Sequence, residues 1–73
     1  MLTANVMAVA NKRANELGVD VLNSLITMTQ YLQDGTIFWR VNYGPKDYIS
    51  RRGGDLIIDV NPVGKIERVL RGQ

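Results

Sequence analysis

Residues 36–44, TIFWRVNYG, constrain the fold of this 73-residue chain most, because bulky apolar side chains recur at every second position. Successive side chains of a β-strand point to opposite faces of a sheet, so a period of two predicts a strand with one buried face. The residues assigned to that face are Ile37, Trp39, Val41 and Tyr43. The preceding dipeptide Asp34-Gly35 predicts a tight hairpin turn, because glycine adopts positive φ at little cost.

Residues 20–33, which precede this turn, fit both a helix and a strand. A helix begun by Asp20 would carry a stripe of Val21, Leu22, Leu25, Met28 and Leu32. A strand would instead separate two faces, with Ile26, Met28 and Leu32 on one and Thr27, Thr29 and Tyr31 on the other. The β-branched Thr27 and Thr29 favour a strand. We therefore favour the strand and keep the helix as the alternative.

Residues 4–17 show the apolar spacing of an amphipathic helix. The stripe consists of Val6, Val9, Ala10, Ala14 and Leu17, with Met7 beside it and Arg13 as an exception at its edge. Thr3 can cap this helix, because its hydroxyl can accept a free backbone N–H of the first turn. Gly18 stands where a left-handed residue would end the helix.

The C-terminal part predicts two further strands joined by a turn at PVGK. The first strand directs Leu56, Ile58 and Val60 inward and Ile57 and Asp59 outward, and the second opposes Ile66, Arg68 and Leu70 to Glu67 and Val69. Pro62 cannot continue a strand ladder, and Gly64 allows the chain to reverse. The charges interleaved in the last strand are typical of an edge strand protected against further pairing.

These elements predict a single small α+β domain over residues 1–73, with one N-terminal helix packed on a three- to four-stranded antiparallel sheet. Such a sheet buries one face under the helix and leaves the other to water or a partner. Phe38, Arg40 and Ile57 fall on that second face and form the candidate surface for a dimer or another partner. The alternative interpretation of Phe38 and Ile57 is two scattered apolar residues of an ordinary surface. The chain has a thin core and no cysteine to staple it, so we expect a homodimer.

The residue types present argue against an enzyme. The chain has no His and no Cys, which excludes Ser-His-Asp sites, cysteine nucleophiles and ordinary zinc sites. Asp55 and Asp59 could form a carboxylate pair, but in a strand their Cα atoms lie about 13 Å apart at a rise of about 3.3 Å per residue. We interpret them as solvated strand charges, and we expect no catalysis, no cofactor and no metal.

Residues 44–54, GPKDYISRRGG, predict a basic loop with glycine at both ends. Lys46, Tyr48, Arg51 and Arg52 are candidate contacts for a partner or an anion, because arginine grips phosphate through two N–H bonds and glycine amides form anion-binding nests. The phosphate-loop pattern GxxxxGK[ST] is absent. We favour a solvated loop whose glycines allow a turn into the next strand, and keep anion or nucleic-acid binding through this loop as the alternative function.

The charge and hydropathy of the chain do not indicate which class of partner it binds. The net charge is +2, with two bases and three acids in residues 1–35 and seven bases and four acids in residues 36–73. No apolar run approaches the roughly 20 residues that span a bilayer. The first residues also lack the pattern of a signal peptide. We expect a cytoplasmic protein with no membrane partner.

The closing half, residues 36–73, carries a family resemblance. FWRV, a loop, GGDLIIDVN, a turn and GKIERVLRGQ resemble the small bacterial immunity proteins of cystatin-like (nuclear-transport-factor-like) fold. The matching positions are Trp39, Val41, Gly53, Gly54, Ile58, Val60, Gly64, Lys65, Ile66, Gly72 and Gln73. The stretch is also similar to the PepSY module, which has a helix and an antiparallel hairpin with a glycine turn.

This resemblance implies a helix on a curved antiparallel sheet, no catalysis, and the binding of another protein. An immunity or inhibitor protein would act by covering a functional surface of its partner. The matching positions are those of turns and core, so the resemblance assigns no binding residue. The leading prediction is a non-enzymatic protein-interaction module that acts as a homodimer.

Overall fold

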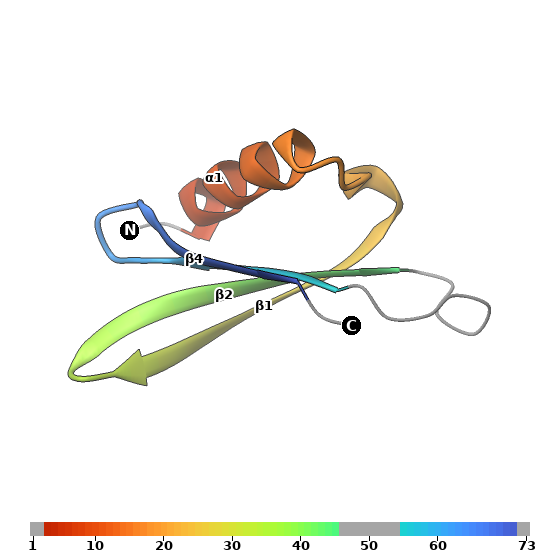
Figure 1. Ribbon diagram of the computed structural model, residues 1–73. Coiled ribbons are helices and arrows are strands. Elements are labelled where there is room, and N and C mark those ends of the chain that lie inside the picture. Colours follow the sequence, from red (N-terminus) through yellow and green to blue (C-terminus); the bar gives the residue numbers. More distant parts are fainter. Residues whose placement is uncertain (1–2, 46–54, 72–73) are drawn as a thin grey trace.

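The computed structural model describes residues 3–45 and 55–71. Its elements are the helix α1 (Thr3–Glu16), the short 3-10 helix η1 (Val21–Asn23), and the strands β1 (Ser24–Gln33), β2 (Thr36–Pro45), β3 (Leu56–Val60) and β4 (Ile66–Arg71). The four strands form one antiparallel sheet in the order β1-β2-β3-β4. The helix lies across one face of this sheet (Figure 1). The predicted α+β class, with one helix on an antiparallel sheet, is confirmed.

The β1–β2 hairpin resolves the ambiguity of residues 20–33 in favour of a strand. Only the single 3-10 turn of η1 is helical there, and β1 then pairs with β2 without a break from Ser24 opposite Pro45 to Gln33 opposite Thr36. The turn residues Asp34 and Gly35 have φ values of 52° and 78°. Two successive positive φ values define a type I′ turn, whose twist matches that of the strands it joins.

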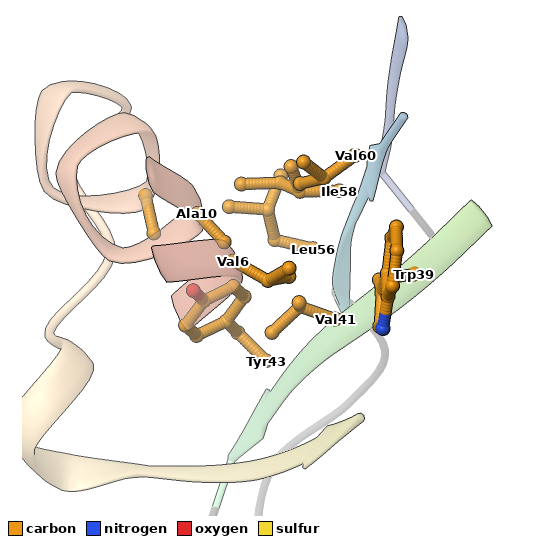
Figure 2. Packing of buried hydrophobic residues seen from close by; sticks show 9 residues of the cluster. Val6, Ala10, Trp39, Val41, Tyr43, Leu56, Ile58 and Val60 are labelled. Carbon is orange, nitrogen blue, oxygen red and sulfur yellow. The ribbon is translucent and has the colours of Figure 1, made fainter. Parts of the chain in front are cut away.

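The core lies between α1 and the facing side of the sheet, as Figure 2 shows. The helix contributes Val6, Ala10 and Ala14, which are fully buried and spaced four residues apart on one side of the helix. The two alanines are small enough to let the helix backbone approach the sheet. The sheet contributes a larger set, which is Trp39, Val41, Tyr43, Leu56, Ile58 and Val60. The alternation of β2 and β3 therefore predicted the buried side correctly.

Among the described residues, two hydrogen bonds from side chains join the helix layer to the sheet. The hydroxyl of Tyr43 donates to Oδ1 of Asn11 at 2.6 Å, and Nη2 of Arg71 donates to the backbone carbonyl of Leu17 at 2.8 Å. The second bond places a cation at the end of α1, where carbonyl groups lack partners within the helix. Together they attach both β2 and β4 to the helix.

The helix boundaries differ by one residue from the prediction of 4–17. The helix begins at Thr3, one residue before the predicted start, and ends at Glu16. Arg13 lies at the exposed edge of the stripe, as expected, and its guanidinium bonds to Glu16 at 3.2 Å. Gly18 has a φ of 85°, which confirms a left-handed residue after the helix. No helix within residues 3–45 and 55–71 has the length and apolar character needed to cross a membrane.

The predicted faces of β4 were wrong for Ile66. Ile66 lies opposite Val60 and Arg68 lies opposite Asp59, so β4 has one residue more than β3 between these two pairs. A bulge of this kind reverses the alternation of side chains on either side of it. Ile66 consequently packs against the core, while Arg68 lies on the other face of the sheet.

Ile37 is also less buried than the alternation of β2 predicted. The β1–β2 hairpin runs beyond the end of α1 (Figure 1), and Ile37 and its partner Leu32 are 47% and 69% exposed. A helix of 14 residues is about 21 Å long, whereas a strand of ten residues spans about 33 Å. The helix cannot cover the whole strand, so these two apolar side chains lie outside the core.

Candidate functional site

The face of the sheet opposite α1, called here the outer face, is the candidate site. The strand pairing places on it the side chains of Leu25, Thr27, Thr29, Tyr31, Gln33, Thr36, Phe38, Arg40, Asn42, Ile57, Asp59, Arg68 and Leu70. Among the described residues, no helix or strand covers this face (Figure 1). The alternation of the strands puts these side chains here, because their neighbours in sequence face the helix.

A buried carboxylate lies at the centre of the outer face. Asp59 on β3 is directly opposite Arg40 on β2, and its side chain is only 1% exposed. Nε of Arg40 donates to Oδ1 at 2.9 Å, and Nη2 donates to Oδ2 at 3.0 Å. Two parallel bonds of this kind fix both the distance and the plane of the ion pair.

Tyr31 completes the hydrogen bonding of this carboxylate from a more distant strand. It belongs to β1, and its hydroxyl donates to Oδ2 of Asp59 on β3 at 3.0 Å. Its side chain therefore extends across β2, where the ring stacks on Phe38 with 5.5 Å between the ring centres. Cζ of Arg40 lies 4.9 Å from the centre of the same ring. Tyr31, Phe38, Arg40 and Asp59 thus form one contiguous cluster, called here the Arg40–Asp59 cluster.

The charges of this cluster are fixed near neutral pH. Burial by itself would raise the pKa of Asp59, but the hydrogen bonds from Arg40 and Tyr31 and the charges of Arg40 and Arg68 hold that pKa below its ordinary value. The hydrogen bond to Asp59 raises the pKa of Arg40. Burial, together with the hydrogen bond to Asp59, raises the pKa of Tyr31. Asp59 is therefore ionised, Arg40 protonated and Tyr31 neutral.

The outer face carries a net charge of +1. Its charged residues are Arg40, Arg68 and Asp59, and Arg68 lies opposite Asp59 on the other side from Arg40. Two cations therefore flank one carboxylate whose oxygen atoms already accept hydrogen bonds inside the protein. The surplus positive charge belongs to guanidinium groups that reach the surface, because the side chain of Arg40 is 36% exposed and Arg68 is exposed.

Apolar side chains surround the cluster on the outer face. Ile57 lies opposite Leu70 on the β3–β4 side, and Leu25 lies near the start of β1. Leu70 and Leu25 are exposed, and Ile57 and Phe38 are half-buried. The outer face therefore combines apolar contact area with a rigid aromatic and cationic centre.

Phe38, Arg40 and Ile57, the residues predicted to share this face, all lie on it. Asp59 was wrongly interpreted as a solvated charge, because it is buried beneath Arg40 and Tyr31. Arg40 itself was assigned to the right surface, but its part in an ion pair was missed. Tyr31 was placed on the correct side of its strand and was not recognised as a site residue. Opposite charges facing outward on two strands were the signal that could have indicated the pair.

The predicted loop contacts Lys46, Tyr48, Arg51 and Arg52 lie outside the described residues. The two arginines of β4 that could extend such a basic surface lie on opposite faces of the sheet, since Arg68 is on the outer face and Arg71 reaches back to Leu17. They do not form a cluster with each other. Binding of an anion or a nucleic acid through the loop stays a prediction.

The chemistry of the Arg40–Asp59 cluster suits recognition better than proton transfer. A carboxylate with a lowered pKa, and with hydrogen bonds to both oxygen atoms, is a poor acceptor for a proton from a substrate. Within the part of the chain that the structure describes, no three or more His, Cys, Asp or Glu residues lie together in a way that could hold a metal ion.

Comparison of the chain with protein-family models, curated proteins and solved structures finds no match. The functional proposal therefore rests on the geometry of the outer face.

Proposed function

We propose that this protein is a non-enzymatic interaction module, of the immunity or inhibitor type, that binds a partner protein through its outer face. The single observation that carries the proposal is an uncovered sheet face built around the Arg40–Asp59 cluster. The proposal includes self-association as a homodimer.

The residue types of the cluster support protein recognition. Tyrosine and arginine are enriched among the few residues that dominate binding energy at protein interfaces. Tyr31 and Arg40 are held in place before any partner arrives, by the ring stack with Phe38 and by the bonds to Asp59. Side chains that are already ordered lose less conformational entropy on binding.

The charge and apolar pattern defines the chemistry of the partner. The partner surface should present apolar side chains to Phe38, Ile57 and Leu70, and a carboxylate to the exposed sides of Arg40 and Arg68. Complementary charges at such a contact set orientation and specificity. Bound in this way, a rigid sheet would cover the partner surface and neutralise it by occlusion. The resemblance of residues 36–73 to immunity proteins supports this mode of action.

The proposal is tested by comparing three baits in a quantitative affinity purification. The wild-type chain, Ile57→Glu and Ala8→Glu are immobilised at equal density and exposed to the same extract. Ala8 is an exposed residue of α1, so Ala8→Glu introduces the same charge change on the opposite side of the molecule. We expect one protein retained by the wild type and by Ala8→Glu and lost with Ile57→Glu. Equal retention by all three baits, or retention by none, would contradict the proposal.

A further inference from the structure

The two edges of the sheet are built differently. β4, at one edge, carries Glu67, Arg68 and Arg71 and contains the bulge beside Val60. Charges and bulges are the features by which natural sheets prevent pairing with another strand. β1, at the other edge, has the sequence SLITMTQYLQ, without a charge, a proline or a glycine, and it pairs with β2 over ten residues without a bulge. The edge at β1 therefore lacks the features that protect the edge at β4.

The geometry of the hairpin determines which backbone groups face that open edge. In a type I′ turn the residues that close it, here Gln33 and Thr36, exchange backbone hydrogen bonds. Hydrogen bonding alternates along an antiparallel ladder. The residues of β1 whose N–H and C=O groups point away from β2 are therefore Ile26, Met28, Gln30 and Leu32. Among the described residues, β2 is the only strand paired with β1.

Exposed apolar side chains lie at both ends of this edge, where a second copy could bury them against each other. At the turn end, Leu32 and Ile37 are exposed on the helix side of the sheet, beyond the reach of α1. At the opposite end, η1 descends from the helix layer to the start of β1 (Figure 1) and carries Leu22, which is 87% exposed. A two-fold axis through the middle of β1 brings the turn end of one copy beside η1 of the other.

We propose that β1 pairs antiparallel with β1 of a second copy, about a two-fold axis at Met28, so that two four-stranded sheets form one sheet of eight strands. This inference rests on the self-association included in the proposed function. In this register Met28 faces Met28, Ile26 faces Gln30 and Leu32 faces Ser24 of the other copy, near its Leu22. On the outer face, this register sets Tyr31 opposite Leu25 of the other copy. The outer faces of both copies then form one continuous surface.

A second copy fits this edge better than a charged peptide would. A strand that is neutral along its whole length pairs with itself without like charges meeting. The two-fold axis also forms two equivalent apolar contacts. In each, Leu32 and Ile37 of one copy lie near Leu22 of the other. An isologous contact of this kind closes on itself, so it ends at a dimer.

The mass of the complex and one proline variant test this arrangement. We expect the wild-type chain to sediment at twice its mass of 8.2 kDa at high micromolar concentration. Gln30→Pro removes an N–H that faces the open edge and leaves the ladder with β2 intact, since proline is tolerated where the N–H of an edge strand faces solvent. This variant should sediment as a folded monomer with an unchanged circular dichroism spectrum. A monomeric wild type, or a Gln30→Pro variant that remains a dimer, would overturn the inference.

Cysteine variants test the register independently of whether Gln30→Pro folds. The chain has no cysteine, and Thr27 and Thr29 are exposed on the outer face. A two-fold axis at Met28 sets Thr27 opposite Thr29 of the other copy, at a Cα distance of about 4.5 Å, which a disulfide can bridge. An oxidised equimolar mixture of Thr27→Cys and Thr29→Cys should yield mainly the mixed disulfide dimer. Random pairing or no cross-link would contradict the register.

The outer-face variant separates this inference from partner binding. Ile57 lies on β3, away from the β1 edge, so Ile57→Glu should remain a dimer while it loses the partner. Gln30→Pro should show the converse, loss of the dimer with the outer face intact. If Ile57→Glu became monomeric while Gln30→Pro stayed dimeric, the dimer would use the outer face and the β1 edge would be excluded.

Discussion

Arg40 and Asp59 face each other across the β2–β3 pair, and two guanidinium nitrogens of Arg40 bind the two carboxylate oxygens of Asp59 at 2.9 and 3.0 Å. The carboxylate is buried on a face of the sheet that no described element covers. Its burial therefore comes from the side chains above it, Arg40 and Tyr31, and not from a second layer. Stability and recognition consequently depend on the same residues.

Breaking this ion pair should destabilise the fold more than replacing it. Arg40→Met removes the two hydrogen bonds of the guanidinium to the Asp59 carboxylate, at an expected cost of about 1–3 kcal/mol in the free energy of unfolding, because Arg40 is 36% exposed and Arg68 still lies opposite Asp59. The double variant Arg40→Met with Asp59→Leu removes both charges and should recover most of that loss. Urea denaturation of the wild type, both single variants and the double variant measures the coupling. Additive losses would show that the pair does not act as a unit.

Tyr31 should stabilise the cluster through its hydroxyl as well as its ring. Tyr31→Phe keeps the stack on Phe38 and removes one hydrogen bond to an ionised group, a change worth about 1.5–3 kcal/mol. Tyr31→Leu removes the stack and the contact with Arg40 in addition, so it should cost more. Denaturation midpoints of the two variants measure the difference. A Tyr31→Phe variant as stable as the wild type would mean that water replaces the hydroxyl at Asp59.

Acid should destabilise the protein through Asp59. The pKa of this carboxyl is lowered in the folded state, so the unfolded chain takes up the proton first as the pH falls. The stability contributed by ionised Asp59 is complete above its ordinary pKa of about 4 and is lost as the pH falls through the lowered folded value. Asp59→Asn should be less stable at neutral pH and should lose less below about pH 4. Urea denaturation at a series of pH values measures both proteins. If their free energies of unfolding fell in parallel below pH 4, Asp59 would not be the cause of the acid destabilisation.

Alkali should destabilise the protein through Tyr43, which is buried under the helix and donates to Asn11. Burial raises its pKa to about 12, so its neutral form stabilises the fold fully below the ordinary value of 10.0. That contribution is lost as the pH rises towards the folded value. Tyr43→Phe should cost about 0.5–1.5 kcal/mol at neutral pH and should flatten the decline above pH 10. The chain has three tyrosines, so the pKa of Tyr43 is obtained from the difference in tyrosine absorbance between titrations of the wild type and Tyr43→Phe.

The small side chains of α1 should be essential for the contact between helix and sheet. Ala10 is fully buried against the sheet, whereas Ala8 is exposed on the opposite side of the same helix. Ala10→Leu would overpack the core at a cost of about 1–3 kcal/mol. Ala8→Leu is the matched control and should change the melting temperature little. Equal effects of the two variants would contradict the packing described for α1.

Local patterns in the chain were enough to predict much of the fold. The spacing of Val6, Ala10 and Ala14 identified the buried side of the helix, and Asp34-Gly35 identified the hairpin. The period of two in residues 36–44 gave the correct inner face of β2. These features depend on neighbours close in sequence, which is why a single sequence reveals them.

The features that define the site depend on contacts distant in sequence. The pairing of Arg40 with Asp59 requires the register of β3 against β2, and a long connection between two strands leaves that register open. The hydrogen bond from Tyr31 on β1 to Asp59 on β3 depends on the same register. The bulge after Ile66 reverses the faces of β4, and no residue of the last strand indicates it. The outer-face position of Phe38, Arg40 and Ile57 was predictable, whereas the burial of Asp59 was not.

The most direct test of the outer face as the binding surface is a titration of the purified partner. Its affinity is measured by calorimetry for the wild type, Ile57→Glu and Ala8→Glu, after each chain has been shown to be folded by its circular dichroism spectrum. The account predicts that Ile57→Glu weakens binding at least about tenfold, a change of about 1.4 kcal/mol, and that Ala8→Glu binds as the wild type does. Unchanged affinity for Ile57→Glu, with weakened binding for Ala8→Glu, would place the partner on the helix and contradict the account.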